Sequence, residues 1–375
     1  MKRLLAVLAA TLLAATLAPA SAGPSAGGVS SDNVEHVQFV PFEVGTATGA
    51  RVVGKYLYVT SWERFSIYDI SDPMAPVRMS TTPFGFKFEN EDVATNGKIL
   101  VFSEELPRSS LHVFDVEDKT NPTPLSTLDG AGQHTMSCLL KCKWLYGSDG
   151  YIIDLRDPAN PKLMDERWGD GMPVAGGHDV NEVAPGIVLT SSDPMLLLDV
   201  RKDPRHPKLL AAATPMQEFI HSNAWPNNAK DKWALASGET WTAGVDAKCD
   251  DRSAGLSTWD TSSWKKTKTI TMVDVWRPKN GTYADGSPVI NAPFGCSSHW
   301  FSAHPKFKNG GLVAAGFYNH GTRFLDVGKD GKITEAGWFL PHGGGTSAAY
   351  WITDEIVYAI DYQRGFDVLK YNAKA

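Results

Sequence analysis

Short apolar runs separated by turn signals recur along most of the chain. The clearest unit has such runs at 55–61 and 65–70, followed by Asp72-Pro73 and a further run at 77–80. Runs rich in β-branched and aromatic residues are typical of strands, and proline ends a strand because it donates no ladder hydrogen bond. The pattern therefore predicts a unit of four short strands.

The unit repeats, and an aspartate after an apolar triplet marks each copy. The seven aspartates are spaced by 46, 39, 45, 61, 66 and 41 residues, and they are Asp69, Asp115, Asp154, Asp199, Asp260, Asp326 and Asp367. Four strands in about 45 residues is the size of one propeller blade. Since the aspartate recurs in every copy, we assign it to turn capping rather than to catalysis. The repeat predicts an all-β, seven-bladed β-propeller.

The two ends of the chain predict how the ring closes. The last copy runs through 366–369 and then lacks its fourth strand, whereas residues 36–42 resemble one. We expect residues 36–42 to complete the last blade, which removes the exposed sheet edge of an open array. The alternative, an open solenoid of stacked sheets, would need capping units at both ends.

The first residues predict export. A positively charged start, the apolar run 4–17 and the small residues 20–22 read as a signal peptide over 1–22. The run is shorter than the roughly 20 residues that a membrane-spanning helix needs. Residues 23–33, rich in Gly, Ser and Ala, are expected to be a flexible tail. We therefore expect a secreted protein without a stable membrane anchor, in which 34–375 form a single propeller domain.

Four cysteines in an exported chain predict two disulfides. Cys138 and Cys142 flank a predicted turn between strands, which allows a local bridge. Cys249 and Cys296 lie in the two longest irregular segments, which their bridge would join. Three pairings exist in principle, and a thiolate metal site at Cys138 and Cys142 is the less favoured alternative in an oxidising compartment.

One polar position near the innermost strand of each copy carries the strongest chemical signal. It holds Glu91 in the second copy and histidine in the next four, namely His134, His178, His221 and His299; the seventh copy has Thr346 there and the first has the 46–48 region. A propeller arranges equivalent positions around one axis. Converging imidazoles are ligands for iron, copper or zinc, and Glu91 would be a further ligand or would orient one imidazole. The alternative is a polar channel lining that binds only ordered water.

Residues 56–77 resemble the LVIVD repeat, a strand-rich unit of bacterial exported and surface proteins, and similar units cover roughly residues 46–371. The resemblance implies a β-propeller without one agreed activity, so it supports the fold and leaves the chemistry open. The histidine ring is also similar, in architecture only, to the four-histidine iron site of the carotenoid oxygenases.

Four further residues are candidates for contact with a ligand. Trp225 and Trp300 lie close in sequence to ring histidines, and His304 and His320 flank the sixth copy. Packing between blades is the alternative for a tryptophan, and a surface turn is the alternative for His304 and His320.

These features predict an exported propeller that binds a ligand at its channel mouth through a transition metal. If it is an enzyme, a metal-dependent oxidoreductase is favoured over a hydrolase, which would need a carboxylate-rich calcium site. The alternative is a metal-free module that presents residues 241–256 and 276–296 to an extracellular protein or polysaccharide. The net charge of −6 and the absence of basic runs interleaved with aromatics exclude nucleic acid as an expected partner.

Overall fold

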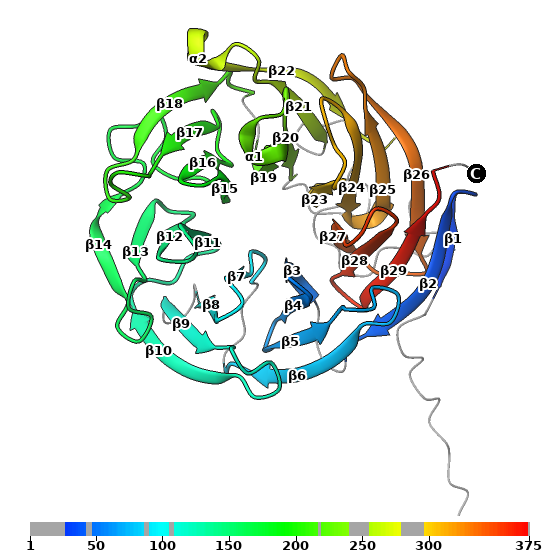
Figure 1. Cartoon of the computed structure of the whole chain (residues 1–375), viewed down its shortest axis with the longest axis horizontal. Coiled ribbons are helices and arrows are strands. Elements are labelled where there is room, and N and C mark those ends of the chain that lie inside the picture. Colours follow the sequence, from blue (N-terminus) through cyan, green and yellow to red (C-terminus); the bar gives the residue numbers. More distant parts are fainter. Residues whose placement is uncertain are drawn as a thin grey trace, which may run out of the picture.

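Strands dominate the chain and form a ring of small antiparallel sheets around a central axis (Figure 1). The computed structural model describes residues 27–42, 47–85, 90–104, 109–216, 219–239, 255–278 and 296–373. The predicted signal peptide, residues 1–22, lies outside these ranges. The ring is the β-propeller architecture that the repeat predicted.

Three sheets each contain four antiparallel strands in chain order, and Figure 1 shows the first strand of each nearest the axis. The first sheet has β3 (Ala47–Val53), β4 (Tyr56–Ser61), β5 (Arg64–Asp69) and β6 (Val77–Pro83). The second has β7 (Ala94–Thr95), β8 (Ile99–Glu104), β9 (Ser110–Asp115) and β10 (Thr123–Asp129). The third has β11 (Met136–Leu139), β12 (Trp144–Gly147), β13 (Tyr151–Asp154) and β14 (Lys162–Arg167).

The next sheet has eight strands because two antiparallel groups join at their outer strands through a short parallel pair. One group has β15 (Val180–Ala184), β16 (Ile187–Thr190), β17 (Leu196–Asp199) and β18 (Lys208–Ala213). The other has β19 (Ile220–Ala224), β20 (Trp233–Gly238), β21 (Leu256–Asp260) and β22 (Thr269–Trp276), with the short helices α1 (Pro226–Ala229) and α2 (Trp264–Thr267). No helix in the described ranges has the length and apolar character needed to cross a membrane.

The last sheet has nine strands and contains both ends of the described chain. Its strands are β1 (Gly28–Ser30), β2 (Val34–Pro41), β23 (Ser298–Ala303), β24 (Gly311–Phe317), β25 (Gly321–Val327), β26 (Ile333–Pro341), β27 (Thr346–Trp351), β28 (Ile356–Asp361) and β29 (Gly365–Tyr371), with the 3₁₀ helix η2 (Tyr318–His320). β2 pairs antiparallel with β29, which is the predicted pairing of an N-terminal strand with the last copy of the repeat. The strand covers Val34–Pro41 instead of 36–42.

The segment predicted to be a flexible tail, residues 23–33, contains a strand. Gly28–Ser30 forms β1, which pairs antiparallel with the outer strand β26 from Gly28 opposite Pro341 to Ser30 opposite Phe339. The expectation of a flexible tail is therefore wrong for this part. The open edge of β26 offers unpaired backbone groups, and their hydrogen bonds outweigh the low strand preference of the Gly- and Ser-rich sequence.

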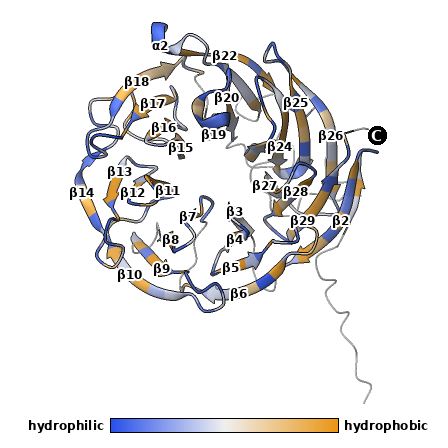
Figure 2. Cartoon of the chain, viewed as in Figure 1, coloured by the Kyte–Doolittle hydropathy of each residue, from blue (hydrophilic) through white to orange (hydrophobic). Residues whose placement is uncertain are grey.

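Apolar side chains fill the space between neighbouring sheets. Leu57 and Tyr68 of the first sheet pack in one cluster with Tyr358 and Phe366 of the last, so this contact also closes the ring. Burial of one such side chain stabilises the fold by about 1.5–3 kcal/mol. Figure 2 shows hydrophobic segments on the strands and hydrophilic turns around the rim.

The repeated aspartate caps the turn after the third strand of a group, as the sequence predicted. In five copies its carboxylate accepts the backbone N–H two residues later at 2.7–3.0 Å, and these residues are Asp69, Asp115, Asp154, Asp199 and Asp260. Asp367 differs because it binds His36 and Arg364 where β2 closes the ring.

The local disulfide is confirmed. Cys138 and Cys142 are bonded across the connection between β11 and β12, with a Cα–Cα separation of 4.4 Å. Cys296 is also disulfide-bonded, and Cys249 lies outside the described residues.

Candidate metal centre

Irregular pairing of the innermost strands sets the positions of the histidines that were predicted to lie around the axis. The register of β19 against β20 shifts between Ile220 and Ser222, which leaves His221 as an extra residue. In front of β15, Ser191 O accepts from His178 N at 2.8 Å while Ser191 N donates to Asp179 O at 2.7 Å, so two residues oppose one. Such β-bulges redirect side chains and are frequent next to functional sites.

Each of three of these imidazoles is held by the backbone at the next innermost strand around the axis. Nδ1 of His178 lies 3.1 Å from His221 O, Nδ1 of His221 lies 3.2 Å from His299 O, and Nδ1 of His299 lies 3.1 Å from Ser347 O. A carbonyl oxygen only accepts hydrogen bonds, so each Nδ1 carries the proton. A neutral ring then presents the lone pair of Nε2 to the axis, which is the metal-binding tautomer.

The seventh ring position is Ser347, one residue after the predicted Thr346. The register of β27 against β28 shifts between Thr346 and Ala348, and this bulge makes Ser347 the residue that meets His299. A one-residue insertion in a strand cannot be located from the alternation of apolar and polar residues. The predicted 46–48 region falls partly outside the described residues, and the side chains at 47 and 48 are not described either.

Glu91 lies among the Nε2 atoms of the four predicted histidines. Its Oε2 is 2.9 Å from His299 Nε2, 3.0 Å from His221 Nε2 and 3.9 Å from His178 Nε2, and its Oε1 is 3.6 Å from His134 Nε2. Ligands about 2.1 Å from a shared ion lie roughly 3.0–4.2 Å apart. The separations to Glu91 therefore suit a common metal ion.

The Glu91 backbone is positioned by the strands on either side of it. Asn90 O accepts from the Thr60 hydroxyl at 2.5 Å, and Asn90 Oδ1 accepts from Ser103 N at 2.9 Å. A Cβ at Gly49 would lie 1.7 Å from the Glu91 carbonyl oxygen, so only glycine admits this approach. The carboxylate is thus presented by a rigid backbone rather than by a loose loop.

Burial sets the charge states of the centre. Burial, and then the neighbouring His221, holds the pKa of His178 well below 6.5, and burial with His299 lowers the pKa of His221. Burial alone would raise the pKa of Glu91, but His299, His134 and His221 together hold it well below its usual value. These directions favour uncharged imidazoles at His178 and His221, whereas the low pKa of Glu91 depends on positive charge beside it, so an ionised carboxylate here has to be balanced by a cation.

In this arrangement the Nε2 lone pairs of His221 and His299 face the oxygen lone pairs of Glu91. His221 and His299 are fully buried, and their Nε2 atoms face an ionised oxygen at hydrogen-bonding distance, although Nδ1 already holds each ring's proton. Nε2 of His178 is buried and has no hydrogen-bond partner in the part of the chain that the structure describes. Buried acceptors that face one another repel, so the centre requires a positive charge, supplied by a metal cation or by extra protons.

The structure adds a carboxylate that the sequence analysis missed. Glu239 follows β20 directly, and its Oε2 is 4.0 Å from His221 Nε2. Its other oxygen accepts from the Tyr318 hydroxyl at 2.7 Å. Two triads have ligand atoms close enough to hold a metal ion, Glu91 with His178 and His221, and Glu239 with His221 and His299. The available signal was a carboxylate immediately after a short, mostly apolar strand.

The other residues predicted to meet a ligand fall at different places. The Trp300 indole donates to Glu91 Oε2 at 3.3 Å, so this side chain belongs to the centre. Trp225 is buried in the hydrophobic core, where its indole donates to Asp231 O. His304 lies in a turn with Nε2 2.9 Å from Asp354 O. His320 is buried in η2, and burial lowers its pKa to about 4.

A pocket of about 480 Å³ opens beside His178. Its lining includes Gly176, Gly177, Ser192 and Phe219. His134 stands near the rim, since its side chain is 33% exposed. The centre is thus bordered by a pocket at His178 and by the partly exposed side chain of His134.

Comparisons with known proteins support the fold and the repeat. Residues 44–82 match the LVIVD repeat family. No curated protein matches the chain. Among solved structures, the WD40 repeats of RRP9 are similar with a TM-score of 0.56 and 11% identity, over 92% of this chain and 99% of that one. At this identity the likeness concerns the fold alone. The chain is thus shown to contain the LVIVD repeat that its sequence resembles, within a β-propeller.

Proposed function

We propose that the protein is an exported, seven-bladed β-propeller that binds a transition metal ion on its axis. The blades are the antiparallel groups of four strands, the last of them completed by β2. His178, His221 and His299 would bind the ion through Nε2, and Glu91 would bind through its carboxylate. His134 would lie at the accessible side of the ion, and Glu239 would neutralise its remaining charge.

One observation carries this proposal: three buried imidazoles have Nδ1 fixed as donor to a backbone carbonyl while Nε2 faces the Glu91 carboxylate. Extra protons would also supply positive charge, but burial disfavours imidazolium and lowers the pKa of two of the rings. A divalent cation neutralises the carboxylate without placing a proton on any ring. Imidazole with carboxylate favours iron, copper or zinc over magnesium or calcium.

The pocket beside His178 gives this centre a place for a small-molecule ligand. A bound metal would supply Lewis-acid or redox chemistry at an accessible coordination position. The chain itself holds the imidazoles in one tautomer, excludes water from His221 and His299, and leaves access on the His134 side. A metal-dependent oxidoreductase is the enzyme class that this ligand set favours.

Export is supported by the predicted signal peptide and by the disulfide at Cys138 and Cys142. Disulfides persist in oxidising compartments and are rare in reducing ones. The LVIVD match agrees with an extracellular location.

The test is the metal content of protein purified from its native export route without a histidine tag, measured by plasma mass spectrometry. We expect near-stoichiometric iron, copper or zinc in the wild type and its loss in a His178→Ala/His221→Ala variant. A His112→Ala/His206→Ala variant is the matched control, because it removes two histidines outside the ring. An empty wild type that also takes up none of these metals would overturn the proposal and direct attention to the segments 241–256 and 276–296.

A further inference from the structure

The innermost strands contribute residues to two separate places along the central axis. Glu91, His134 and His178 stand just before β7, β11 and β15, whereas a second pocket lies along and beyond the same strands. This pocket has a volume of about 520 Å³ and is lined partly by Asn96 and Asn181. We propose that it is a separate binding site for a small organic anion that carries carboxylate or phosphate groups.

Charge is the first argument. Among the described lining residues, Arg51, Lys98 and Lys141 are cations and Glu182 is the one carboxylate. The whole chain carries a net charge of −6, so this cationic pocket is a local reversal of sign. Clustered cations in a concave site concentrate anions near them.

Neither Glu182 nor Asp92, which pairs with Arg51, neutralises Lys98 and Lys141. Glu182 Oε1 accepts from Gly186 N at 2.6 Å, and Glu182 Oε2 accepts from Leu140 N at 2.9 Å. Lys98 lies 3.5 Å from Glu117, but both side chains are more than 60% exposed, and such a pair is weak. An anionic ligand therefore meets little competition from protein carboxylates for the ammonium groups of Lys98 and Lys141.

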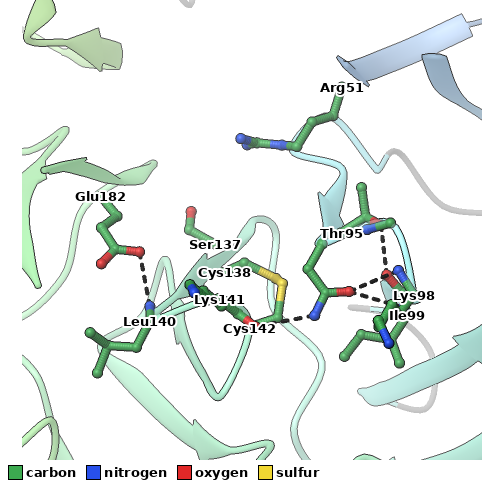
Figure 3. The surroundings of a disulfide bond; sticks show 12 residues. Arg51, Thr95, Lys98, Ile99, Ser137, Cys138, Leu140, Lys141, Cys142 and Glu182 are labelled. Atoms are coloured by element: carbon green, nitrogen blue, oxygen red, sulfur yellow. Dashed lines mark hydrogen bonds between the residues drawn. A yellow bond between two sulfur atoms is a disulfide. The ribbon is translucent and has the colours of Figure 1, made fainter. Parts of the chain in front are cut away.

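A hydrogen bond to Asp92 orients the Arg51 guanidinium. Its Nη2 donates to Asp92 Oδ1 at 2.5 Å, and Asp92 Oδ2 accepts from the Ser137 hydroxyl at 2.7 Å. The Arg51 side chain remains 42% exposed, and Figure 3 shows its guanidinium directed into the space above Ser137. A guanidinium held in this way has further N–H groups for a planar carboxylate or a phosphate.

The wall that carries Lys141 is built by an unusual turn. Leu140, Lys141 and Cys142 have φ of 53°, 64° and 59°, a left-handed conformation that residues with a Cβ rarely adopt. The disulfide closes this turn, Glu182 binds its Leu140 N, and Asn96 Nδ2 donates to Lys141 O at 3.1 Å (Figure 3). Lys141 is thus held at the pocket by contacts on both sides.

The test is calorimetric titration with inorganic phosphate and, separately, with succinate, at constant ionic strength. We expect saturable binding of at least one of them, weakened at least about tenfold in a Lys98→Gln/Lys141→Gln variant. A Lys265→Gln/Lys266→Gln variant removes two exposed lysines on α2 and should bind as the wild type does. Comparison of the two probes distinguishes a phosphate ligand from a carboxylate ligand.

A third variant separates this site from the axial centre. His178→Ala/His221→Ala should keep the anion affinity of the wild type, since the cationic pocket lies at a separate place along the central axis. The proposal is overturned if neither probe binds, if the Lys98→Gln/Lys141→Gln variant binds as tightly as the wild type, or if only the histidine variant loses binding.

Discussion

Before the innermost strands, imidazole and carboxylate groups converge in a buried centre; along and beyond the same strands, guanidinium and ammonium groups face an open pocket. The same inner strands contribute to both ends. His178 stands just before β15 and Glu182 lies within it, while β11 connects His134 with Cys138. We propose that the first end binds a cation and that the second takes an anion.

The difference between the two ends lies in burial as much as in charge. His221 and His299 are fully buried, so their contacts with a bound ion would be little screened by water. Arg51 and Lys98 are partly or largely exposed, so their contacts with an anion are screened by water and salt. Changes at the axial centre should therefore have larger effects than changes at the cationic pocket.

The largest effect is expected for Glu91→Gln. The amide removes the anionic ligand from the centre. The metal affinity should therefore fall by more than about 100-fold, which exceeds the loss typical of residues that only orient a ligand. The matched control is Glu104→Gln, which alters a buried carboxylate 3.2 Å from His112 outside the ring. Competition with a metallochromic chelator measures both affinities, and equal affinities in both variants would contradict the assignment of Glu91.

Acid should release the metal from the axial centre. The pKa values of His178 and His221 lie below 6.5, so protons begin to compete for Nε2 only below that pH. We expect full metal retention at pH 7 and half-release at a pH below 6.5, with rebinding when the pH is restored. Metal content after dialysis at stepped pH provides the measurement, and half-release at or above pH 6.5 would argue against neutral buried ligands.

A smaller effect is expected when the disulfide beside the cationic pocket is removed. In a Cys138→Ser/Cys142→Ser variant the left-handed turn loses its covalent closure and Lys141 is held less firmly. Anion affinity should fall about fivefold, equivalent to about 1 kcal/mol for one exposed charged contact. Metal content should not change. A variant that loses metal but keeps its anion affinity would show that the disulfide supports the axial centre and not the cationic pocket.

The smallest effect is expected at the rim, outside both ends. The hydrogen bond from Arg201 lowers the pKa of Asp199 to about 2 against an ordinary 3.8. A depressed carboxyl pKa stabilises the fold above pH 3.8, and this contribution is lost as the pH falls toward 2. Asp199→Asn should lower the free energy of unfolding by about 0.5 kcal/mol at pH 7, since the pair is exposed.

Urea unfolding at pH 7 and at pH 3 measures this difference, which should be smaller at the lower pH. Metal and anion affinity should match the wild type in both conditions. A difference that grows on acidification would mean that the rim aspartate does not act through its ionised form.

Most residues of the axial centre could be predicted from the repeat. The positions of His134, His178, His221, His299 and Glu91 were recognised because copies of one unit place equivalent residues around one axis. Glu239 escaped this reasoning because it follows the second strand of its group, whereas the copies were compared at a position before the first strand. Tyr318 and the cationic pocket escaped it too, since their partners are distant in sequence.

The amino-acid sequence by itself determined the all-β repeat, the capping aspartates, the local disulfide and the pairing of the N-terminal strand with the last copy. Each of these features follows from local patterns of strand and turn residues, or from the fourth strand that the last copy lacks and the N-terminal segment supplies. Only the tertiary structure decided that Ser347 meets His299, that Nδ1 faces a carbonyl in three rings, and that β1 covers β26. These features depend on bulges and on contacts between strand groups that are distant in sequence, which strand periodicity does not encode.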